Sequence, residues 1–285
     1  MKLVVISGVS GSGKSTALHV LEDQDYYCID NLPVGLLPDF AVKMNAFPGQ
    51  LGDLAAVGID ARNPALDLSR FPQILDKLKA AGVDCEVIYI DADDDVLLKR
   101  FSETRRKHPL SGEGVPLHEA IHHERLLLQP IVDRADLFID TSQRNVHQLR
   151  DLIRERIQGV QGSDLSILFE SFGFKHGIAT DADFIFDARC LPNPHWEANL
   201  RALTGRDKPV ADFLESQDLV NQYFEQISSM MTTWIPAFEA DNRSYLTIAI
   251  GCTGGQHRSV YLTERLGQYF RKQRDHVIIR HRDLP

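Results

Sequence analysis

Short apolar runs alternate with amphipathic stretches through the first half of the chain, and each run ends in a polar turn. The runs lie at residues 2–7, 26–29, 54–59, 85–90 and 135–141. Apolar runs of this length, separated by stretches with helical periodicity, are typical of parallel strands that are covered by helices on both faces. We therefore predict an α/β fold with a parallel sheet, followed by a helix near residues 146–157.

The stretch Gln158-Gly-Val-Gln-Gly-Ser163 interrupts this pattern, because it is polar and contains two glycines. Beyond it, strand-like runs resume at residues 165–170, 183–187 and 245–250. A helical segment at 209–231 lies between the last two runs. Since 285 residues exceed the usual size of one domain, we predict two α/β domains, at residues 1–157 and 165–285, with a linker at 158–164.

The first apolar run leads into Gly8-Val-Ser-Gly-Ser-Gly-Lys14-Ser15, which has the Walker A (P-loop) pattern G-x-x-x-x-G-K-S. Its position between a strand and a helical run is the context in which this pattern binds phosphates. The glycines let backbone N–H groups turn inward, Lys14 reaches the β- and γ-phosphates, and Ser15 ligates Mg²⁺. The helix N-terminus adds partial positive charge. We predict a nucleotide site here; the alternative is a structural glycine-rich turn.

Other polar residues could complete this site. Asp30 and Asp60 each close an apolar run, where a carboxylate either holds the water shell of Mg²⁺ or simply forms a turn. The basic segment Lys99–Arg106 could supply arginines to the phosphates, or it could be a solvated helix face. We identify no base for an acceptor hydroxyl, so binding with slow hydrolysis is at least as well supported as efficient phosphoryl transfer.

A second glycine-rich turn, Gly251-Cys-Thr-Gly-Gly-Gln-His-Arg-Ser259, follows the last long apolar run and precedes an amphipathic helix at 260–270. Its backbone N–H groups and Arg258 suit a phosphorylated ligand. The spacing of Cys252 and Arg258 also equals that of cysteine phosphatases, in which a thiolate attacks phosphorus. A plain turn without a ligand is the third interpretation. His195 stands on a rigid turn with two prolines, which suits a ligand contact.

Composition limits the classes of partner. The net charge is −9, so any nucleic-acid site must be local. The segment 271–285 reverses this sign, because it holds five Lys and Arg side chains against two Asp, which indicates either a solvated surface or contacts to phosphate backbones. The four cysteines are widely spaced, and the first apolar run is too short for a signal peptide or a membrane span. We expect a cytoplasmic protein without a membrane partner.

Six motifs in order resemble the RapZ/YvcJ family of bacterial nucleotide-binding proteins, and the resemblance covers the whole chain. They are Gly8–Ser15, Tyr27–Pro33, Asp60–Asn63, Ser171–Lys175 with Gly177, Asp187–Arg189 with Leu191–His195, and Gly251–Tyr261. The resemblance implies a P-loop kinase-like first domain that binds ATP and GTP with Mg²⁺ and hydrolyses them weakly. It also implies a second domain with a sugar-phosphate-binding fold related to phosphofructokinase.

The resemblance assigns roles to individual positions. ATP binding falls to Gly8, Val9, Ser10, Gly11, Ser12, Gly13, Lys14 and Ser15, and GTP binding to Asp60, Ala61, Arg62 and Asn63. Glucosamine-6-phosphate binding falls to His195, Thr253, Gly254, Gly255, His257, Arg258 and Ser259. The basic residues expected at an RNA face are Arg271, Lys272, Arg274, Arg280 and Arg282.

The expected function is therefore a nucleotide-binding regulatory adapter. By the resemblance, it senses glucosamine-6-phosphate, forms a homo-oligomer and presents small regulatory RNA to an endoribonuclease, with two-component regulators as further partners. The enterobacterial relative continues past its Arg-His-Arg segment into a basic tail, whereas here only Asp-Leu-Pro follows Arg282, which weakens the RNA expectation. The alternatives are a small-molecule kinase and a cysteine phosphatase that uses Cys252.

Overall fold

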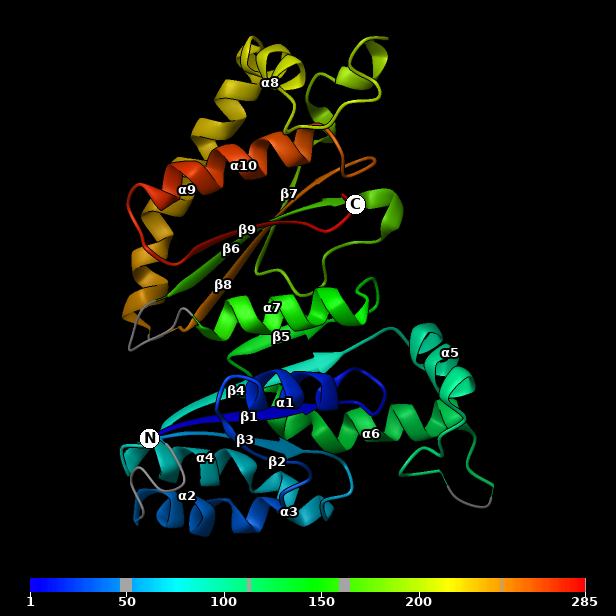
Figure 1. Ribbon diagram of the computed structural model, residues 1–285, viewed down its shortest axis with the longest axis vertical. Helices are drawn as coiled ribbons and strands as arrows, with labels where there is room; N and C mark the ends of the chain where they lie inside the picture. The colour runs from blue at the N-terminus through cyan, green and yellow to red at the C-terminus, as the bar shows by residue number, and fades with distance from the viewer. Residues whose placement is uncertain (47–52, 112–113, 159–164, 242, 285) are drawn as a thin grey trace. The chain divides into compact units, whose positions relative to one another are not determined.

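The computed structural model describes residues 1–46, 53–111, 114–158, 165–241 and 243–284. The chain divides into two compact units, Met1–Arg154 and Glu155–Pro285, which are described separately (Figure 1). Apart from Gln158, the predicted linker at 158–164 lies outside the described residues.

The first unit is built on a parallel five-stranded sheet with the order β2-β3-β1-β4-β5. The strands are β1 (Lys2–Gly8), β2 (Tyr27–Ile29), β3 (Leu54–Ile59), β4 (Asp84–Asp91) and β5 (Leu137–Asp140). All five fall on the predicted apolar runs. Because the strands are parallel, their carboxyl ends share one edge of the sheet, and the loop Gly8–Ser15 leaves β1 at that edge.

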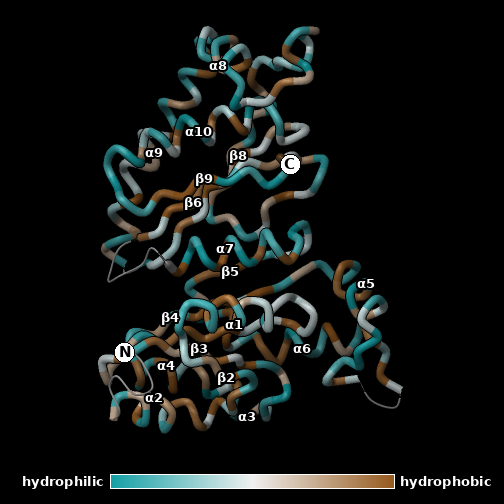
Figure 2. Tube along the Cα trace, in the orientation of Figure 1, coloured by the Kyte–Doolittle hydropathy of each residue, from teal (hydrophilic) through white to brown (hydrophobic). Residues whose placement is uncertain are grey.

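Helices cover both faces of this sheet, and their apolar sides form the core. They are α1 (Lys14–Glu22), α2 (Leu37–Ala46), α3 (Ala65–Ser69), α4 (Phe71–Ala80), α5 (Asp94–Thr104), α6 (Leu117–Val132) and α7 (Val146–Gln158), of which residues 146–154 belong to this unit. One core joins buried side chains of β1, β3 and β4 to α2, α4 and α6, for example Val57, Leu75 and Leu128. The strands accordingly stand out as hydrophobic along the trace (Figure 2). The predicted α/β class is confirmed.

The second unit contains a parallel four-stranded sheet with the order β7-β8-β6-β9. Its strands are β6 (Ser166–Gly173), β7 (Phe184–Asp187), β8 (Tyr245–Cys252) and β9 (Val277–His281). Its helices are α8 (Lys208–Glu215), α9 (Asp218–Ala240) and α10 (Arg258–Arg271). These helices pack on one face of the sheet through residues such as Leu214, Met231 and Leu266.

The predicted helical segment at 209–231 is helical, but it forms the two helices α8 and α9, and the second continues to Ala240. The chain breaks at Ser216 and Gln217, where the side chain of Asn221 donates to the carbonyl of Glu215 at 2.8 Å. Both helices still bury an apolar stripe, with Val210 in α8 and Ile227 in α9. Apolar periodicity ran through the break and concealed it.

Candidate functional site

The loop Gly8–Ser15 has the backbone that a phosphate cradle requires. Gly8 has φ 146°, and a Cβ there would lie 1.9 Å from the carbonyl oxygen of Ile90, so only glycine fits. Gly13 forms the N-cap of α1 with φ 119° and provides no side-chain cap. The N–H groups of the first turn of α1 therefore lack a side-chain cap, which suits an anion. The exposed side chain of Ser15 lies in this turn.

Lys14 folds back over the loop that carries it. Its Nζ donates to the carbonyl of Gly8 at 2.7 Å and to that of Val9 at 3.0 Å. Burial lowers the pKa of the Lys14 ammonium, while the carboxylates of Glu124 and Asp60 oppose that shift. Negative charge thus already surrounds this cation, and a nucleotide phosphate would have to compete with it.

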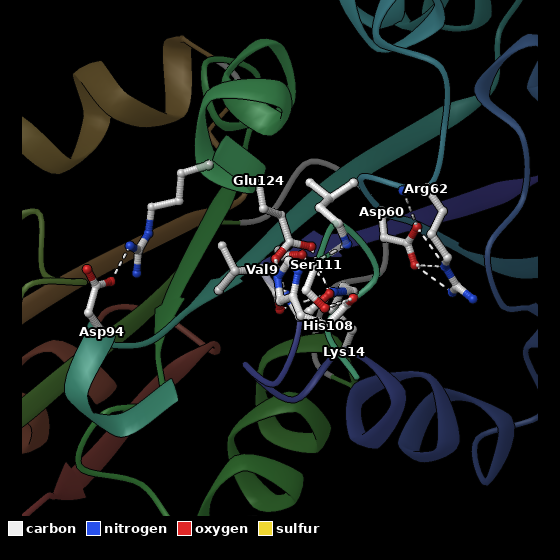
Figure 3. A network of polar contacts seen from close by, with 12 residues as sticks. Val9, Lys14, Asp60, Arg62, Asp94, His108, Ser111 and Glu124 are labelled. Atoms are coloured by element: carbon white, nitrogen blue, oxygen red, sulfur yellow. Dashed lines mark hydrogen bonds and ion pairs between the residues drawn. The ribbon is translucent and has the colours of Figure 1, made fainter. Parts of the chain in front are cut away.

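Glu124 on α6 is a site residue that sequence reasoning missed. Its carboxylate accepts from the N–H and the hydroxyl of Ser10, both at 2.8 Å. It also contacts the His108 ring at 2.9 Å, and Figure 3 shows these two residues together. Burial acts to raise the pKa of Glu124, but the hydrogen bond from His108 and the charge of Lys14 outweigh it, so the pKa is lowered. Glu124 is therefore a buried carboxylate at the phosphate loop.

Arg100 on α5 lies against the middle of the loop. It donates to the carbonyl of Gly11 at 3.0 Å and to the hydroxyl of Thr141 at 2.9 Å. Thr141 itself donates to the carbonyl of Ser12 at 2.8 Å, so the end of β5 also supports the loop. Within the predicted basic segment, Arg100 thus contacts the phosphate loop, whereas Lys99 pairs with Glu103 on the exposed face of α5.

The segment Asp60–Asn63 lies at the same sheet edge, directly after β3. Both carboxylate oxygens of Asp60 bind the Arg62 guanidinium, with Oδ2 2.6 Å from one terminal nitrogen (Figure 3). Burial acts to raise the pKa of Asp60, but the hydrogen bonds from Arg62 outweigh it and the pKa is lowered. The buried amide of Asn63 accepts from Val34 N–H at 2.7 Å and holds the neighbouring loop.

The second glycine-rich loop connects β8 to α10 in the second unit. Gly255 has φ 70°, and a Cβ there would lie 2.7 Å from the backbone nitrogen of Gly173. His257 is the N-cap of α10 and forms no side-chain cap, so the first turn of α10 also suits an anion. The exposed Lys175 lies over this loop, since its Nζ would be 3.7 Å from a Cβ at Gly254.

The predicted sugar-phosphate residues converge on this loop. The buried Arg258 donates to the carbonyls of Arg189 and Leu191 and approaches the hydroxyl of Thr253 at 3.4 Å, while its Nε is buried without a partner in the described part of the chain. The rings of His195 and His257 lie 6.3 Å apart. Burial lowers the pKa of His257, which favours its neutral form.

Cys252 lies at the base of this loop and is almost fully enclosed. Its Sγ is 3.1 Å from the hydroxyl of Ser259, and only 3% of the residue is exposed. Burial acts to raise the pKa of the Cys252 thiol, but hydrogen bonds from Ser259 and the N–H of Gly255 outweigh it and lower the pKa. The pKa of the Cys252 thiol is lowered but its sulfur is poorly accessible, and a nucleophile needs both thiolate character and access.

Both loops are flanked by an Asp-Ala-Arg segment with the same contacts. Asp187 binds Arg189 through the backbone N–H at 2.9 Å, Nε and a terminal nitrogen at 2.6 Å. Asp60 binds Arg62 through the same groups, with the corresponding distances at 2.9 and 2.6 Å. The two units therefore share a local structure beside their glycine-rich loops.

The strand registers place these two segments equivalently. In the second unit, Asp187 of β7 pairs with Gly251 of β8, the first glycine of the second loop. In the first unit, the last pair between β3 and β1 is Ile59 with Ser7, directly before Asp60 and the first loop glycine. Each aspartate thus stands beside the first glycine of a loop, on the neighbouring strand.

Most of the basic residues predicted for an RNA face make contacts within the chain. Four have internal partners: Arg271 (carbonyl of Val277), Arg274 (Glu239), Arg280 (Glu155) and Arg282 (carbonyl of Gly177 and ring of Phe172). Lys272 is exposed at the end of α10. The carboxylates of Glu239 and Glu155 would compete with RNA phosphates for Arg274 and Arg280, whereas a carbonyl partner leaves the positive charge of Arg271 in place.

The sequence matches two protein domain families in succession. Residues 1–161 match the RapZ-like N-terminal domain, and residues 165–285 match the RapZ C-terminal domain. No helix in the described ranges has the length and apolar character needed to cross a membrane.

Proteins that are similar over the full length share the name "nucleotide-binding protein". One from Nitrosococcus oceani is 58% identical, and the alignment covers 100% of both chains. One from Alkalilimnicola ehrlichii is 57% identical over 100% of this chain and 98% of its own. One from Pseudomonas fluorescens is 55% identical over 100% of both. The resemblance seen in the motifs is confirmed, and the chain belongs to the RapZ-like family.

Proposed function

We propose that the first unit binds ATP or GTP with Mg²⁺ through Gly8–Ser15. The observation that carries this proposal is the uncapped first turn of α1, which follows a glycine-rich loop and begins with Lys14. In this proposal Lys14 binds the terminal phosphates, and the Ser15 hydroxyl helps to hold Mg²⁺. Asp60 and Arg62 provide further polar contacts for GTP. The names of the relatives support nucleotide binding in general.

Calorimetric titration with Mg·ATP and Mg·GTP tests this site. Lys14→Ala should weaken binding about 10- to 100-fold, because it removes a charge-assisted hydrogen bond to phosphate. Lys77→Ala, which removes an exposed lysine of α4, is the matched control and should leave the affinity unchanged. Equal affinity of the Lys14 variant and the wild type would contradict the assignment.

We propose further that the second unit binds glucosamine-6-phosphate at Gly251–Ser259. Support comes from the uncapped first turn of α10, from the buried Nε of Arg258, which has no partner among the described residues, and from the exposed Lys175 over the loop. Titration of the full chain with glucosamine-6-phosphate, against unphosphorylated glucosamine, tests the proposal. His195→Ala should weaken binding of the phosphorylated sugar, with the exposed His122→Ala as control. Binding of neither sugar would leave the loop without this ligand.

The wider proposal is a regulatory adapter with weak ATPase and GTPase activity, which acts through small RNA and an endoribonuclease. It rests on family membership and on two glycine-rich loops that each lead into a helix without a side-chain cap. A small-molecule kinase is the rival from the enzyme class. ADP formation that rises steeply only when an acceptor metabolite is added would favour the kinase, whereas slow, acceptor-independent hydrolysis would favour the adapter.

A further inference from the structure

The proposed nucleotide site contains a buried negative charge, although its ligand is an anion. Glu124 is 0% exposed, and its carboxylate receives three hydrogen bonds. Oε2 accepts from the N–H of Ser10 at 2.8 Å and lies 2.9 Å from His108, while Oε1 accepts from the Ser10 hydroxyl at 2.8 Å (Figure 3). The carboxylate therefore occupies donors of the phosphate loop itself.

His108 is a hydrogen-bond donor in this contact. Its Nδ1 accepts from the backbone N–H of Leu110 at 3.1 Å, so the ring proton is on Nε2 and points to Glu124. His108 is 2% exposed and lies between α5 and α6, next to the exposed residues Arg105–Lys107. Glu124 thus joins the phosphate loop to the segment that precedes α6.

These contacts argue against Glu124 as a general base. Three donors contact the carboxylate of Glu124, and hydrogen bonds to the ionised form lower its affinity for a proton, which makes it a weak base. The same donors stabilise its ionised form. Glu124 is therefore a fixed negative charge. It contacts Ser10 and interacts electrostatically with Lys14, the residue that reaches the β- and γ-phosphates in such loops.

We propose that Glu124 is a specificity-determining residue that makes the site distinguish nucleoside triphosphates from diphosphates. This inference rests on the nucleotide site proposed above. A γ-phosphate near Ser10 and Lys14 meets the carboxylate at close range, so it is bound only if Glu124 gives up its contacts to Ser10. That displacement also releases His108. A nucleoside diphosphate has no phosphate at this position, so the contacts of Glu124 to Ser10 and His108 stay in place.

Glu124→Gln tests the charge with little change of shape. In the full chain with Mg²⁺, we would measure the dissociation constants of ADP and of the non-hydrolysable adenosine 5′-(β,γ-imido)triphosphate. The variant should shift their ratio about tenfold toward the triphosphate, because a like charge within a few ångströms is removed. Glu119→Gln, on the exposed side of the same helix, should leave the ratio unchanged. A purely structural role would weaken both ligands equally, and that result would overturn the proposal.

Trypsin provides a second readout, because Arg105–Lys107 adjoin His108. The triphosphate analogue should accelerate cleavage there in the wild type, and ADP should not. Equal cleavage with both ligands would count against displacement of Glu124.

Ser10→Ala covers the case in which Glu124→Gln does not fold. It removes one of the three donors and should shift the affinity ratio in the same direction by a smaller factor, and a shift toward ADP would overturn the proposal. If the wild type binds both ADP and the analogue, and both variants have the same ratio of the two dissociation constants as the wild type, this inference alone fails. If the wild type binds neither, the nucleotide site fails with it.

Discussion

An ion pair between an aspartate and an arginine lies beside each glycine-rich loop. Asp60 with Arg62 and Asp187 with Arg189 turn the chain sharply after a strand, because each carboxylate accepts from the backbone and the guanidinium of the residue two positions on. The first pair is half-enclosed, with the Asp60 side chain 7% exposed, whereas both partners of the second are largely exposed. The first should therefore contribute more to stability than the second.

Asp60→Asn should show this contribution through its pH dependence. The pKa of Asp60 is lower in the folded protein than in the unfolded chain, so its ionised form stabilises the fold above the ordinary aspartate pKa. This stabilisation is lost as the pH falls through the folded pKa. Since Arg62 is half-exposed, we expect the variant to lose about 1 kcal/mol at pH 7, and the difference from wild type to vanish in strong acid.

Urea unfolding at a series of pH values measures this difference. Asp76→Asn is the matched control, because Asp76 pairs with Arg134 at 2.7 Å on an exposed surface. It should change the free energy of unfolding by less than about 0.5 kcal/mol. An effect of Asp60→Asn that is the same at every pH would show that its charge is not responsible.

The four cysteines should differ in their rates of alkylation, because their sulfur atoms differ in accessibility and in pKa. Burial raises the pKa of Cys85 to about 12, and that of Cys28 to about 11. Cys190 is exposed, while Cys252 has a lowered pKa but an enclosed sulfur. Iodoacetamide at pH 8 should therefore modify Cys190 first, as peptide mass spectrometry would show.

Rapid modification of Cys252 would instead revive the phosphatase alternative. That alternative also predicts that the wild type releases phosphate from an aryl phosphate and that Cys252→Ser does not. If the wild type releases no phosphate while the serine variant keeps its affinity for the phosphorylated sugar, the thiol has no catalytic role.

At the scale of elements, the junction of β1 with the phosphate loop is the most constrained point of the first unit. Gly8→Ala would place a Cβ 1.9 Å from the Ile90 carbonyl oxygen of β4, at a φ of 146°. The adjacent strand cannot retreat without breaking its pairing with β1. We expect a loss of about 3 kcal/mol or more in the free energy of unfolding.

Gly35→Ala is the matched control for this junction. A Cβ at Gly35 would meet nothing within 4 Å, so the substitution should change stability by less than about 1 kcal/mol. Denaturation midpoints of the two variants give the comparison. Similar midpoints for both would mean that β4 can move away from the loop.

The sequence could predict the strands, which leave a local apolar pattern, but it could not predict contacts between residues that are far apart along the chain. The strands at 2–7 and 54–59 are apolar because they are buried on both faces, so they are visible without tertiary knowledge. The contact of Glu124 with Ser10 spans 114 residues and follows no local spacing. The repeated Asp-Ala-Arg segment was visible in the sequence, but its meaning depends on strand order, which brings each copy beside a loop.

At the scale of the whole molecule, the chain combines two parallel sheets, each with a glycine-rich loop after an inner strand. In each unit the loop leads into a helix that lacks a side-chain cap at its N-terminus. The net charge of −9 repels anions at long range, so both loops must act through local donors. If each loop binds its proposed phosphate ligand, recognition rests on donors within that loop, and ligand binding in one unit should not require the other.

Differential scanning calorimetry can test that independence in the full chain. A ligand at about 100 times its dissociation constant adds about 2.7 kcal/mol to the stability of the unit it binds, which raises the melting temperature of a unit of this size by about 5–10 °C. Mg·ATP should shift one transition and glucosamine-6-phosphate the other. Lys14→Ala should abolish the first shift and keep the second, because Lys14 lies in the first unit alone. If glucosamine-6-phosphate also fails to shift the second transition of this variant, the two sites are coupled, and nucleotide binding in the first unit affects ligand binding in the second.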